Sequence, residues 1–410
     1  MIAIDEIKNK HSAEMAIVVQ ACRVYFKTAT VEELQELINS TVFDWKEVLV
    51  ICRNHSVRPI VYKILCTTNN IPSGIALIIK EEYLTITTKS WHQALETERL
   101  ILLLKENGIE AVPYKGTAFS KQFYGDLVSR ESSDIDLVIQ KENLSRVIAV
   151  MEKDGYIAEI KMVYDYLGNK YFKYYKDFNF NKFKKRERIF HIEFHWGVAE
   201  VYLGVNKNID GLLYQTNGNI QLLKKDVAVL NLNAHYLAIL VHHAVKDVFK
   251  SLKNISDIAT VAQHNLAEND LRYINEQLDR LQIRKAFFLG NTLTTDILGI
   301  SLVDKAQCKI SRKQADVFLF QVLSKNIIDS HGLKSTKLFN ARFVINTHSA
   351  TKVRFIYYMI KDRFTPTIVD FRIICLPKPL FFIYCICKPF RSFIKSYNSK
   401  EEKARLIPGE

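Results

Sequence analysis

Apolar residues recur at three- and four-residue spacing over the first hundred residues, which predicts a series of helices. The segment TVEELQELINS shows this clearly, with Thr30 as the expected N-cap and Glu33 completing a capping box. A longer helical stretch begins near Ile75 and is expected to end at Gly108, which suits a helix C-terminus. We therefore expect an α-helical N-terminal domain, residues 1–108.

From Ile109 to about Val205, short runs rich in β-branched and aromatic residues predict strands instead. These runs are IEAVPYKG, DIDLVI, YFKYYKDFNFNKF and RIFHIEFHWGV. Between the second and the third, ENLSRVIAVMEKDGY has helical spacing and is closed by Gly155. The order strand, long loop, strand, helix, strand, strand predicts a module with a mixed sheet, which we assign to residues 109–205.

Helical spacing returns after Asn231, most clearly in AHYLAILVHHAVKDVFKSLKNISDIATVAQH. We assign residues 206–340 to a C-terminal helical domain. The remainder, residues 341–410, is basic and aromatic with several prolines, and is expected to be a tail that packs on the body or lies on a surface. The predicted fold class is therefore α+β, with a small mixed sheet flanked by helical regions.

The composition and net charge of the chain indicate a folded protein with anionic partners. The 410 residues are 48% apolar, which is enough for packed cores, and they carry a net charge of +13 that favours nucleotides, nucleic acid or lipid as partners. The seven scattered cysteines lack zinc-ribbon spacing and the N-terminus does not resemble a secretory signal, so we expect a cytoplasmic protein with reduced thiols. The most apolar stretch, residues 373–390, is interrupted by proline and lysine and is too short to span a bilayer.

Two aspartates interrupt the apolar strand ESSDIDLVI. Because side chains alternate along a strand, Asp134 and Asp136 share one face while Ile135 and Leu137 point into a core. Two carboxylates one strand repeat apart repel each other unless a cation lies near them, and Mg²⁺ accepts such oxygen ligands. For an isolated pair the alternative, two exposed aspartates at a strand edge, would be favoured.

The segments on either side favour the metal site. Upstream, a predicted strand ends at Lys115 and turns at Gly116, and the amides of such a turn can approach phosphate oxygens. Downstream, HIEFHW places Glu193 on one face between His191 and His195, where a third carboxylate ligand would stand. A zinc site on the two histidines is less favoured, since they start roughly 13 Å apart on an extended strand.

The segment YKGTAFSKQFYGDLVSRESSDIDLVI, followed by a helix, DGY and IEFHW, resembles the uncharacterised nucleotidyltransferase family of the DNA polymerase beta-like superfamily. The segments WKEVLVICRNHSVRPIVYKIL, HAVKDVFKSLKNISDIA and LPKPLFFIYCICKPFRSF resemble its N-terminal helices, a later helical motif and its closing segment. The resemblance thus covers most of the chain. It implies that Asp134, Asp136 and Glu193 hold two Mg²⁺ ions, with Mn²⁺ as the alternative metal.

The resemblance also implies transfer of a nucleoside monophosphate from a nucleoside triphosphate, with ATP expected, to a hydroxyl of an unknown small molecule, saccharide or protein. The implied triphosphate contacts are Lys115, Gly116, Thr117, Arg130 and Ser133. Thr117 departs from the Gly or Ser common in compact members, and the loop before Asp134 is longer than theirs. Three residues are candidates for orienting ligands or acceptor: His195, His243 and Lys246.

Three alternatives stay open. The chain could be a non-catalytic member that binds nucleotide or a protein partner. It could bind nucleic acid through YFKYYKDFNFNKFKKRER, where aromatics alternate with cations, although ordinary half-buried β-structure explains that pattern better. Finally, residues 373–397 could contact the inner face of a membrane through Phe381, Phe382 and Tyr384, with packing on the body as the favoured reading.

Overall fold

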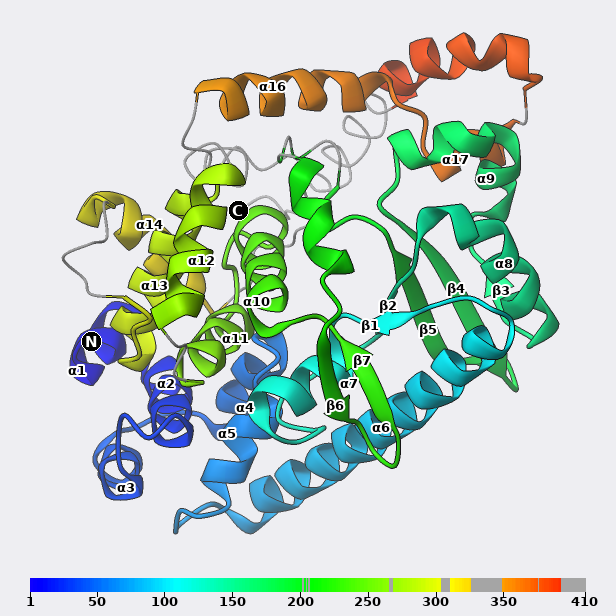
Figure 1. The fold of residues 1–410 in the computed structure, drawn as a ribbon. Helices are drawn as coiled ribbons and strands as arrows, with labels where there is room; N and C mark the ends of the chain where they lie inside the picture. The colour runs from blue at the N-terminus through cyan, green and yellow to red at the C-terminus, as the bar shows by residue number, and fades with distance from the viewer. Residues whose placement is uncertain are drawn as a thin grey trace, which may run out of the picture.

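The computed structural model describes residues 1–200, 203, 205, 207–264, 268–303, 310–325, 349–374 and 376–391. In this part of the chain, helices surround a five-stranded sheet on several sides (Figure 1). A separate two-stranded sheet lies against an edge of the larger one. The predicted α+β fold class, a mixed sheet flanked by helical regions, is confirmed.

The N-terminal region is helical, as its spacing predicted. Its helices are α1 (Ile4–Lys10), α2 (Ala13–Tyr25), α3 (Val31–Ser40), α4 (Trp45–Asn54), α5 (Arg58–Leu65) and α6 (Ser73–Glu106). The predicted capping box at the start of α3 is present, with Thr30 and Glu33 exchanging hydrogen bonds. Helix α6 runs along one edge of the molecule (Figure 1). Leu100 and Leu104 near its end are buried in one cluster with apolar residues of the larger sheet.

The larger sheet has the strand order β1-β2-β5-β4-β3. Its strands are β1 (Val112–Pro113), β2 (Ile135–Val138), β3 (Ile157–Ala158), β4 (Asp177–Lys184) and β5 (Glu187–His195). Strands β2 and β5 are parallel and all other neighbours are antiparallel, so the sheet is mixed. Helix α8 (Leu144–Lys153) follows β2, and α9 (Lys161–Leu167) follows β3.

The two faces of this sheet differ in chemistry. Ile135, Leu137, Phe178 and Phe194 lie on one face and are buried in a single cluster with apolar residues of α6 and α8. The alternate residues of the same strands are mostly polar, although Val138 among them is buried in the helical core. The two-residue period of the strands therefore separates the core of this module from its largely polar side.

Three local features differ from the sequence expectation. The loop between β1 and β2 contains a short helix, α7 (Gly116–Phe119), and a π-helical turn, Ser120–Tyr124. The third predicted strand begins only at Asp177, because a 3-10 segment, Gly168–Lys173, occupies its expected start. The hairpin of β6 (Gly218–Gln221) and β7 (Asp226–Val229) was not predicted, since each strand has four residues and little apolar pattern.

The later helices pack against the N-terminal ones. They are α10 (Leu232–Val241), α11 (Leu252–Ala262), α12 (Glu268–Arg280), α13 (Arg284–Leu298) and α14 (Arg312–Val322). The helical spacing that follows Asn231 corresponds to two helices, α10 and α11, which are separated after the π-helical turn His242–Lys246, where Val248 and Phe249 have positive φ angles. One core cluster contains residues of α2, α4, α5, α10, α11 and α13, so both helical regions share a core. The four-part domain division stays a prediction.

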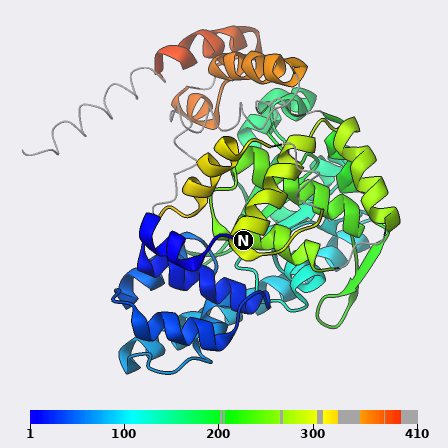
Figure 2. The same cartoon turned by 90° about the vertical axis from the view of Figure 1, so that its left-hand side faces the viewer.

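The C-terminal segments form a layer along the edge opposite α6 (Figures 1 and 2). They are α16 (Ser349–Phe364), α17 (Ile368–Ile373), a 3-10 turn (Lys378–Leu380) and a helix over residues 381–391. Tyr384 is buried against Phe371, with ring centroids 4.7 Å apart, so it packs on the body and is not available for insertion into a membrane. Residues 392–397 of the predicted contact lie outside the described residues. Within the described ranges, no helix combines the length and the apolar character needed to cross a bilayer.

Candidate functional site

The parallel register of β2 and β5 sets Asp136 directly beside Glu193 on the polar face of the sheet. His195, one strand repeat further along β5, is fully buried. Its Nε2 lies 2.9 Å from Oδ1 of Asp136 and 3.3 Å from Oε2 of Glu193. One ligand-type atom from each of the three residues falls within 4.8 Å of the others. We call these three residues the carboxylate cluster.

Lys115 supplies positive charge to this cluster. Its Nζ lies 3.3 Å from Oδ1 of Asp136, and both side chains are buried. Burial would raise the pKa of Asp136, but the charge of Lys115 and the hydrogen bond with His195 outweigh burial and hold that pKa well below its ordinary value. Burial lowers the pKa of Lys115, against the opposing effect of Asp136. Asp136 is therefore an ionised acceptor at neutral pH.

Glu193 is held between two histidines. His191 Nε2 lies 3.5 Å from Glu193 Oε1, and His195 approaches the other carboxylate oxygen. Burial would raise the pKa of Glu193, but hydrogen bonding by His191 and His195 holds it far below its ordinary value. The hydrogen bond with Glu193 in turn raises the pKa of His191. Glu193 is thus an ionised carboxylate in a site partly closed to solvent.

Asp134 lies immediately before β2 and is not a member of the carboxylate cluster. Its Oδ2 accepts a hydrogen bond of 2.6 Å from the hydroxyl of Ser133, which is itself exposed. Burial raises the pKa of Asp134, and the negative charges of Asp136 and Glu193 raise it further. The structure therefore brings Asp136 and Glu193 together. Asp134 is a third carboxylate, close enough for the charges of both to raise its pKa.

The turn at Gly116 packs directly on the segment that carries Asp134. Gly116 has a φ of +59°, which disfavours any residue with a side chain. A Cβ at this position would also lie 3.2 Å from the backbone oxygen of Asp134. Thr117, the next residue, is buried at the start of α7. A glycine is therefore required here both by the backbone conformation and by the close approach of the two segments.

Arg130 and His243 meet at Asp257, and none of the three belongs to the carboxylate cluster. Arg130 Nε donates to both carboxylate oxygens of Asp257 at 3.0 Å, and both side chains are buried. His243 Nε2 lies 2.8 Å from Asp257, and the Tyr124 hydroxyl donates to it at 2.9 Å. The expected contact of Arg130 with triphosphate stays a prediction. The Nε atom of Arg130 already donates hydrogen bonds to Asp257.

A second group of metal-ligand residues, His242, His243 and Asp247, lies in the π-helical turn after α10. Both ring nitrogens of His243 already have partners, because Nε2 faces Asp257 and Nδ1 lies 2.8 Å from the side-chain amide of Asn254. These contacts favour a structural hydrogen-bond network over a metal site.

The sequence did not single out Lys176, Asp177 or Glu200. Asp177 pairs with His195 across β4 and β5, and its Oδ2 lies 3.8 Å from His195 Nδ1. Lys176 is buried beside Asp177 and lies 4.0 Å from Glu200, which also pairs with Lys246 at 3.4 Å. The alternating polar residues Asp177, Asn179 and Asn181 indicate in the sequence that one face of β4 is polar. The sequence does not show the register that pairs this face with the polar face of β5.

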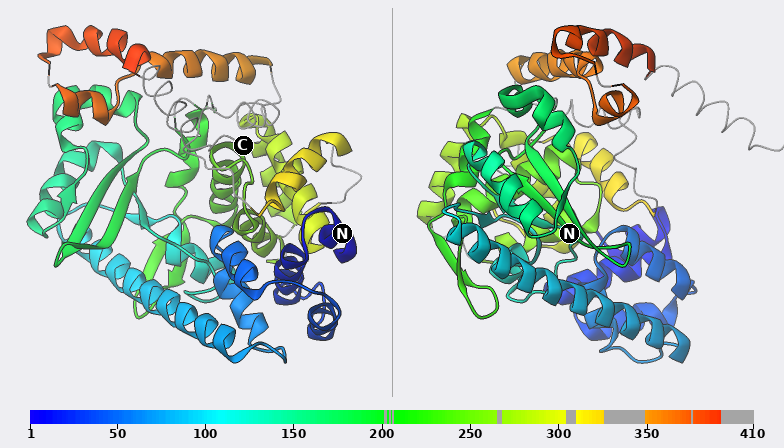
Figure 3. Two further views of the ribbon diagram at one scale, coloured as in Figure 1. Left: turned by 180° about the vertical axis from the view of Figure 1, so that it is seen from behind. Right: turned by 90° about the vertical axis from the view of Figure 1, so that its right-hand side faces the viewer.

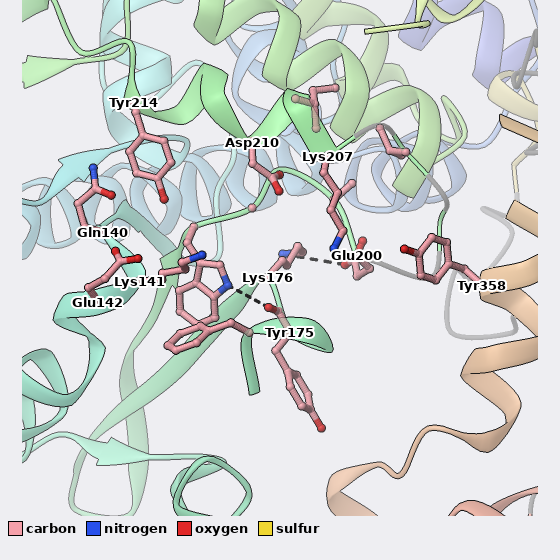
Figure 4. Close-up of a pocket in the computed structure, with 16 residues that line it drawn as sticks. Gln140, Lys141, Glu142, Tyr175, Lys176, Glu200, Lys207, Asp210, Tyr214 and Tyr358 are labelled. Carbon is pink, nitrogen blue, oxygen red and sulfur yellow. Dashed lines mark hydrogen bonds and ion pairs between the residues drawn. The ribbon is translucent and has the colours of Figure 1, made fainter. Parts of the chain in front are cut away.

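A pocket of about 380 Å³ opens next to these residues, at the ends of β2 and β5 (Figure 4). Its wall combines aromatic rings with charged groups, including Lys176, Trp196, Lys207, Asp210 and Tyr358. Lys176 and Glu200 stand together on one side, while Tyr358 reaches in from α16 (Figure 4). Burial raises the pKa of Asp210 to about 6, although its Oδ1 accepts a hydrogen bond from the Val198 amide. Through Lys176 and Asp177, the pocket adjoins the carboxylate cluster.

Comparison with known proteins identifies the family. A family model described as uncharacterised nucleotidyltransferase matches residues 41–299, which run from just before α4 to the end of α13. The match includes the whole larger sheet, the carboxylate cluster and the residues around Asp257. A search of curated proteins found no match. As its motifs predicted, the chain belongs to the uncharacterised nucleotidyltransferase family.

Proposed function

We propose that this protein moves a nucleoside monophosphate from a nucleoside triphosphate, ATP being the expected donor, to a hydroxyl group of an acceptor. The family supports nucleotidyl transfer in general. The observation that carries the proposal is the pairing of Asp136 and Glu193 across parallel strands, where their carboxylates converge with His195 on a mostly buried polar face. Buried carboxylates in this arrangement are costly unless a cation compensates them.

The residues present fit a divalent metal. Asp136 and Glu193 supply two oxygens within one small cluster, and Asp134 stands beside them with a pKa raised by burial and by its two acidic neighbours. Hard oxygen donors of this kind suit Mg²⁺, with Mn²⁺ as the alternative. Metal ions bound at such a site stabilise the charge that develops on the phosphates and lower the pKa of the attacking hydroxyl.

The remaining groups are assigned to binding and proton handling. The acceptor oxygen bonds to the α-phosphorus while the bond from that phosphorus to the pyrophosphate oxygen breaks, and pyrophosphate leaves with the electron pair. Glu193 is the group we assign to receive the hydroxyl proton. Lys115 lies beside Asp136, where its ammonium can balance phosphate charge, and the Gly116 turn offers backbone amides next to Asp134.

We assign the acceptor to the pocket beside Lys176. Its aromatic rings can cover the apolar faces of a small molecule or a saccharide, while Lys207 and Asp210 can hold polar groups. The pocket adjoins the carboxylate cluster through Lys176 and Asp177, as a site for the attacking hydroxyl requires. A protein side chain presented on a loop could enter it in the same way.

The test is pyrophosphate release from ATP or GTP with Mg²⁺ and a panel of hydroxyl-bearing acceptors. Asp136→Ala and Asp134→Asn are expected to lower the rate at least ~100-fold. Asp226→Asn, at an exposed position on β7, is the matched control and should behave as wild type. A transfer activity that survives both substitutions undiminished would show that the site lies elsewhere. Mg²⁺-dependent ATP binding without turnover on any acceptor would favour the non-catalytic alternative.

A further inference from the structure

Helix α16 carries an exposed apolar stripe. It consists of Val353, Ile356, Tyr357, Ile360 and Phe364, whose exposed fractions lie between 41 and 66%. Spacings of three and four residues put these side chains on one side of the helix. On the opposite side Phe355 is buried and Tyr358 lines the pocket. The stripe therefore faces away from the body of the protein.

The last described helix, residues 381–391, repeats this arrangement. Phe382, Ile386 and Phe390 follow at four-residue spacing and are 55 to 67% exposed, while Tyr384 and Lys388 between them are buried. Seen from two further directions, this helix and α16 form one outer layer on the edge of the molecule (Figure 3). We call the exposed apolar residues of the two helices the outer face.

The charge around the outer face is strongly positive. Residues 349–391 contain eight Lys or Arg and only two Asp. At 3.6 residues per turn, the cations of α16 border its apolar stripe on both sides: Lys352 and Arg363 on one, Arg354 and Lys361 on the other. An apolar stripe bordered by cations is typical of helices that lie in the surface of an anionic membrane.

A second copy of this chain fits the outer face less well. Two such faces would bring like charges together around the apolar contact, which opposes association. A lipid surface with anionic headgroups instead matches the positive border and accepts the exposed rings and aliphatic chains. We propose that the outer face binds peripherally to the surface of an anionic membrane, with α16 and the helix over residues 381–391 lying in the headgroup region.

The experiment is flotation of the full-length protein with vesicles of phosphatidylcholine alone or mixed with phosphatidylglycerol. We expect flotation only with the anionic vesicles, and its loss in high salt, because part of the attraction is electrostatic. Ile360→Asp should weaken binding at least ~10-fold, since it places a charge within the apolar stripe. Its matched control is Leu84→Asp on α6, because Ile360 and Leu84 are 58 and 55% exposed and because helices α16 and α6 lie on opposite edges of the molecule.

Two charge-reversal variants test the role of the cations beside the apolar stripe separately. Arg363→Glu exchanges an attractive charge for a repulsive one, so we expect a roughly 25-fold loss of vesicle binding. Lys80→Glu, at an exposed position on α6, should have little effect. Circular dichroism melting of each variant checks that the fold is kept.

Three results would overturn the proposal. The first is an absence of flotation with anionic vesicles, and the second is equal binding by wild type and Ile360→Asp. The third is a dimer in light scattering that Ile360→Asp converts to monomer without any vesicle binding, which would make the outer face a protein interface. None of these readouts depends on nucleotidyl transfer.

Discussion

Asp136 on β2 and Glu193 on β5 stand directly opposite each other in a parallel register, although two helices, two strands and several turns separate them in the chain. Side chains at paired positions of neighbouring strands share one face of a sheet. A slip of one residue would move Glu193 to the apolar face and bring Ile192 or Phe194 beside Asp136. The register of this strand pair therefore determines whether the site exists.

The first prediction concerns metal binding at this pair. Mg²⁺ at ten times its dissociation constant is expected to stabilise the wild-type fold by about 1.4 kcal/mol, because it binds only the folded state. In Glu193→Gln the stabilisation should disappear, since one of the two paired carboxylates is lost. Thermal melting with and without Mg²⁺, and with EDTA, measures the effect. An unchanged Mg²⁺ response in Glu193→Gln would contradict this assignment.

The second prediction concerns Gly116. Alanine at this position must adopt a left-handed backbone, at a cost of about 1 kcal/mol, and its Cβ must push against the backbone of Asp134. Gly155→Ala is the matched control, because Gly155 also has a positive φ but open space around it. Both variants should lose stability in urea unfolding, Gly116→Ala somewhat more because of the contact with Asp134, and only Gly116→Ala should weaken ATP binding. Equal ATP affinity in the two variants would show that the contact with Asp134 has no role.

The third prediction concerns the buried ion pair of Arg130 and Asp257. Asp257→Asn leaves the Arg130 guanidinium buried without its counter-charge, so the free energy of unfolding should fall by about 3 to 5 kcal/mol. Adding Arg130→Met to this variant should recover part of the loss, because the unpaired charge is then removed. Urea titration of the wild type and both variants measures this. A double variant that is less stable than Asp257→Asn would refute the argument.

The fourth prediction concerns pH and Asp210. Its folded-state pKa of about 6 lies above the ordinary value near 3.9, so the folded protein holds this proton more tightly than the unfolded chain. The contribution of Asp210 to stability is therefore greatest below pH ~4 and is lost as the pH rises through about 6. Asp210→Asn should remove this decline and be more stable than wild type by up to about 3 kcal/mol at pH 7.5. Unfolding curves at pH 4.5 and 7.5 test it, and an equal pH response in the two proteins would contradict it.

Much of the fold followed from local patterns. Thr30 and Glu33 fixed the start of α3, and the alternation of Ile135 and Leu137 with the two aspartates fixed the faces of β2. Such signals are local, because each depends on neighbours within one helical turn or one strand repeat. Periodicity could not predict the break at Val248, since its positive φ occurs at a β-branched residue and no glycine marks the turn.

The sequence predicted only part of the site, because local patterns do not show contacts between distant segments. The motif marked Asp136 and Glu193, but no local pattern shows that β4 brings Asp177 to His195 or that α11 brings Asp257 to Arg130. Register and helix packing are set by contacts between segments far apart in the chain. A charged residue near a motif, such as Arg130, can therefore belong to a different buried network.

Tyr358 gives α16 a second role. The ring lines the pocket from one side of the helix, while the opposite side of the same helix carries Ile356 and Ile360. A rigid helix transmits a shift of one side to the other, so any ligand that displaces α16 from outside also reshapes the pocket wall. Where that change alters the affinity of the pocket for its ligand, thermodynamic reciprocity requires the converse: occupancy of the pocket changes the affinity of the outer side by the same factor.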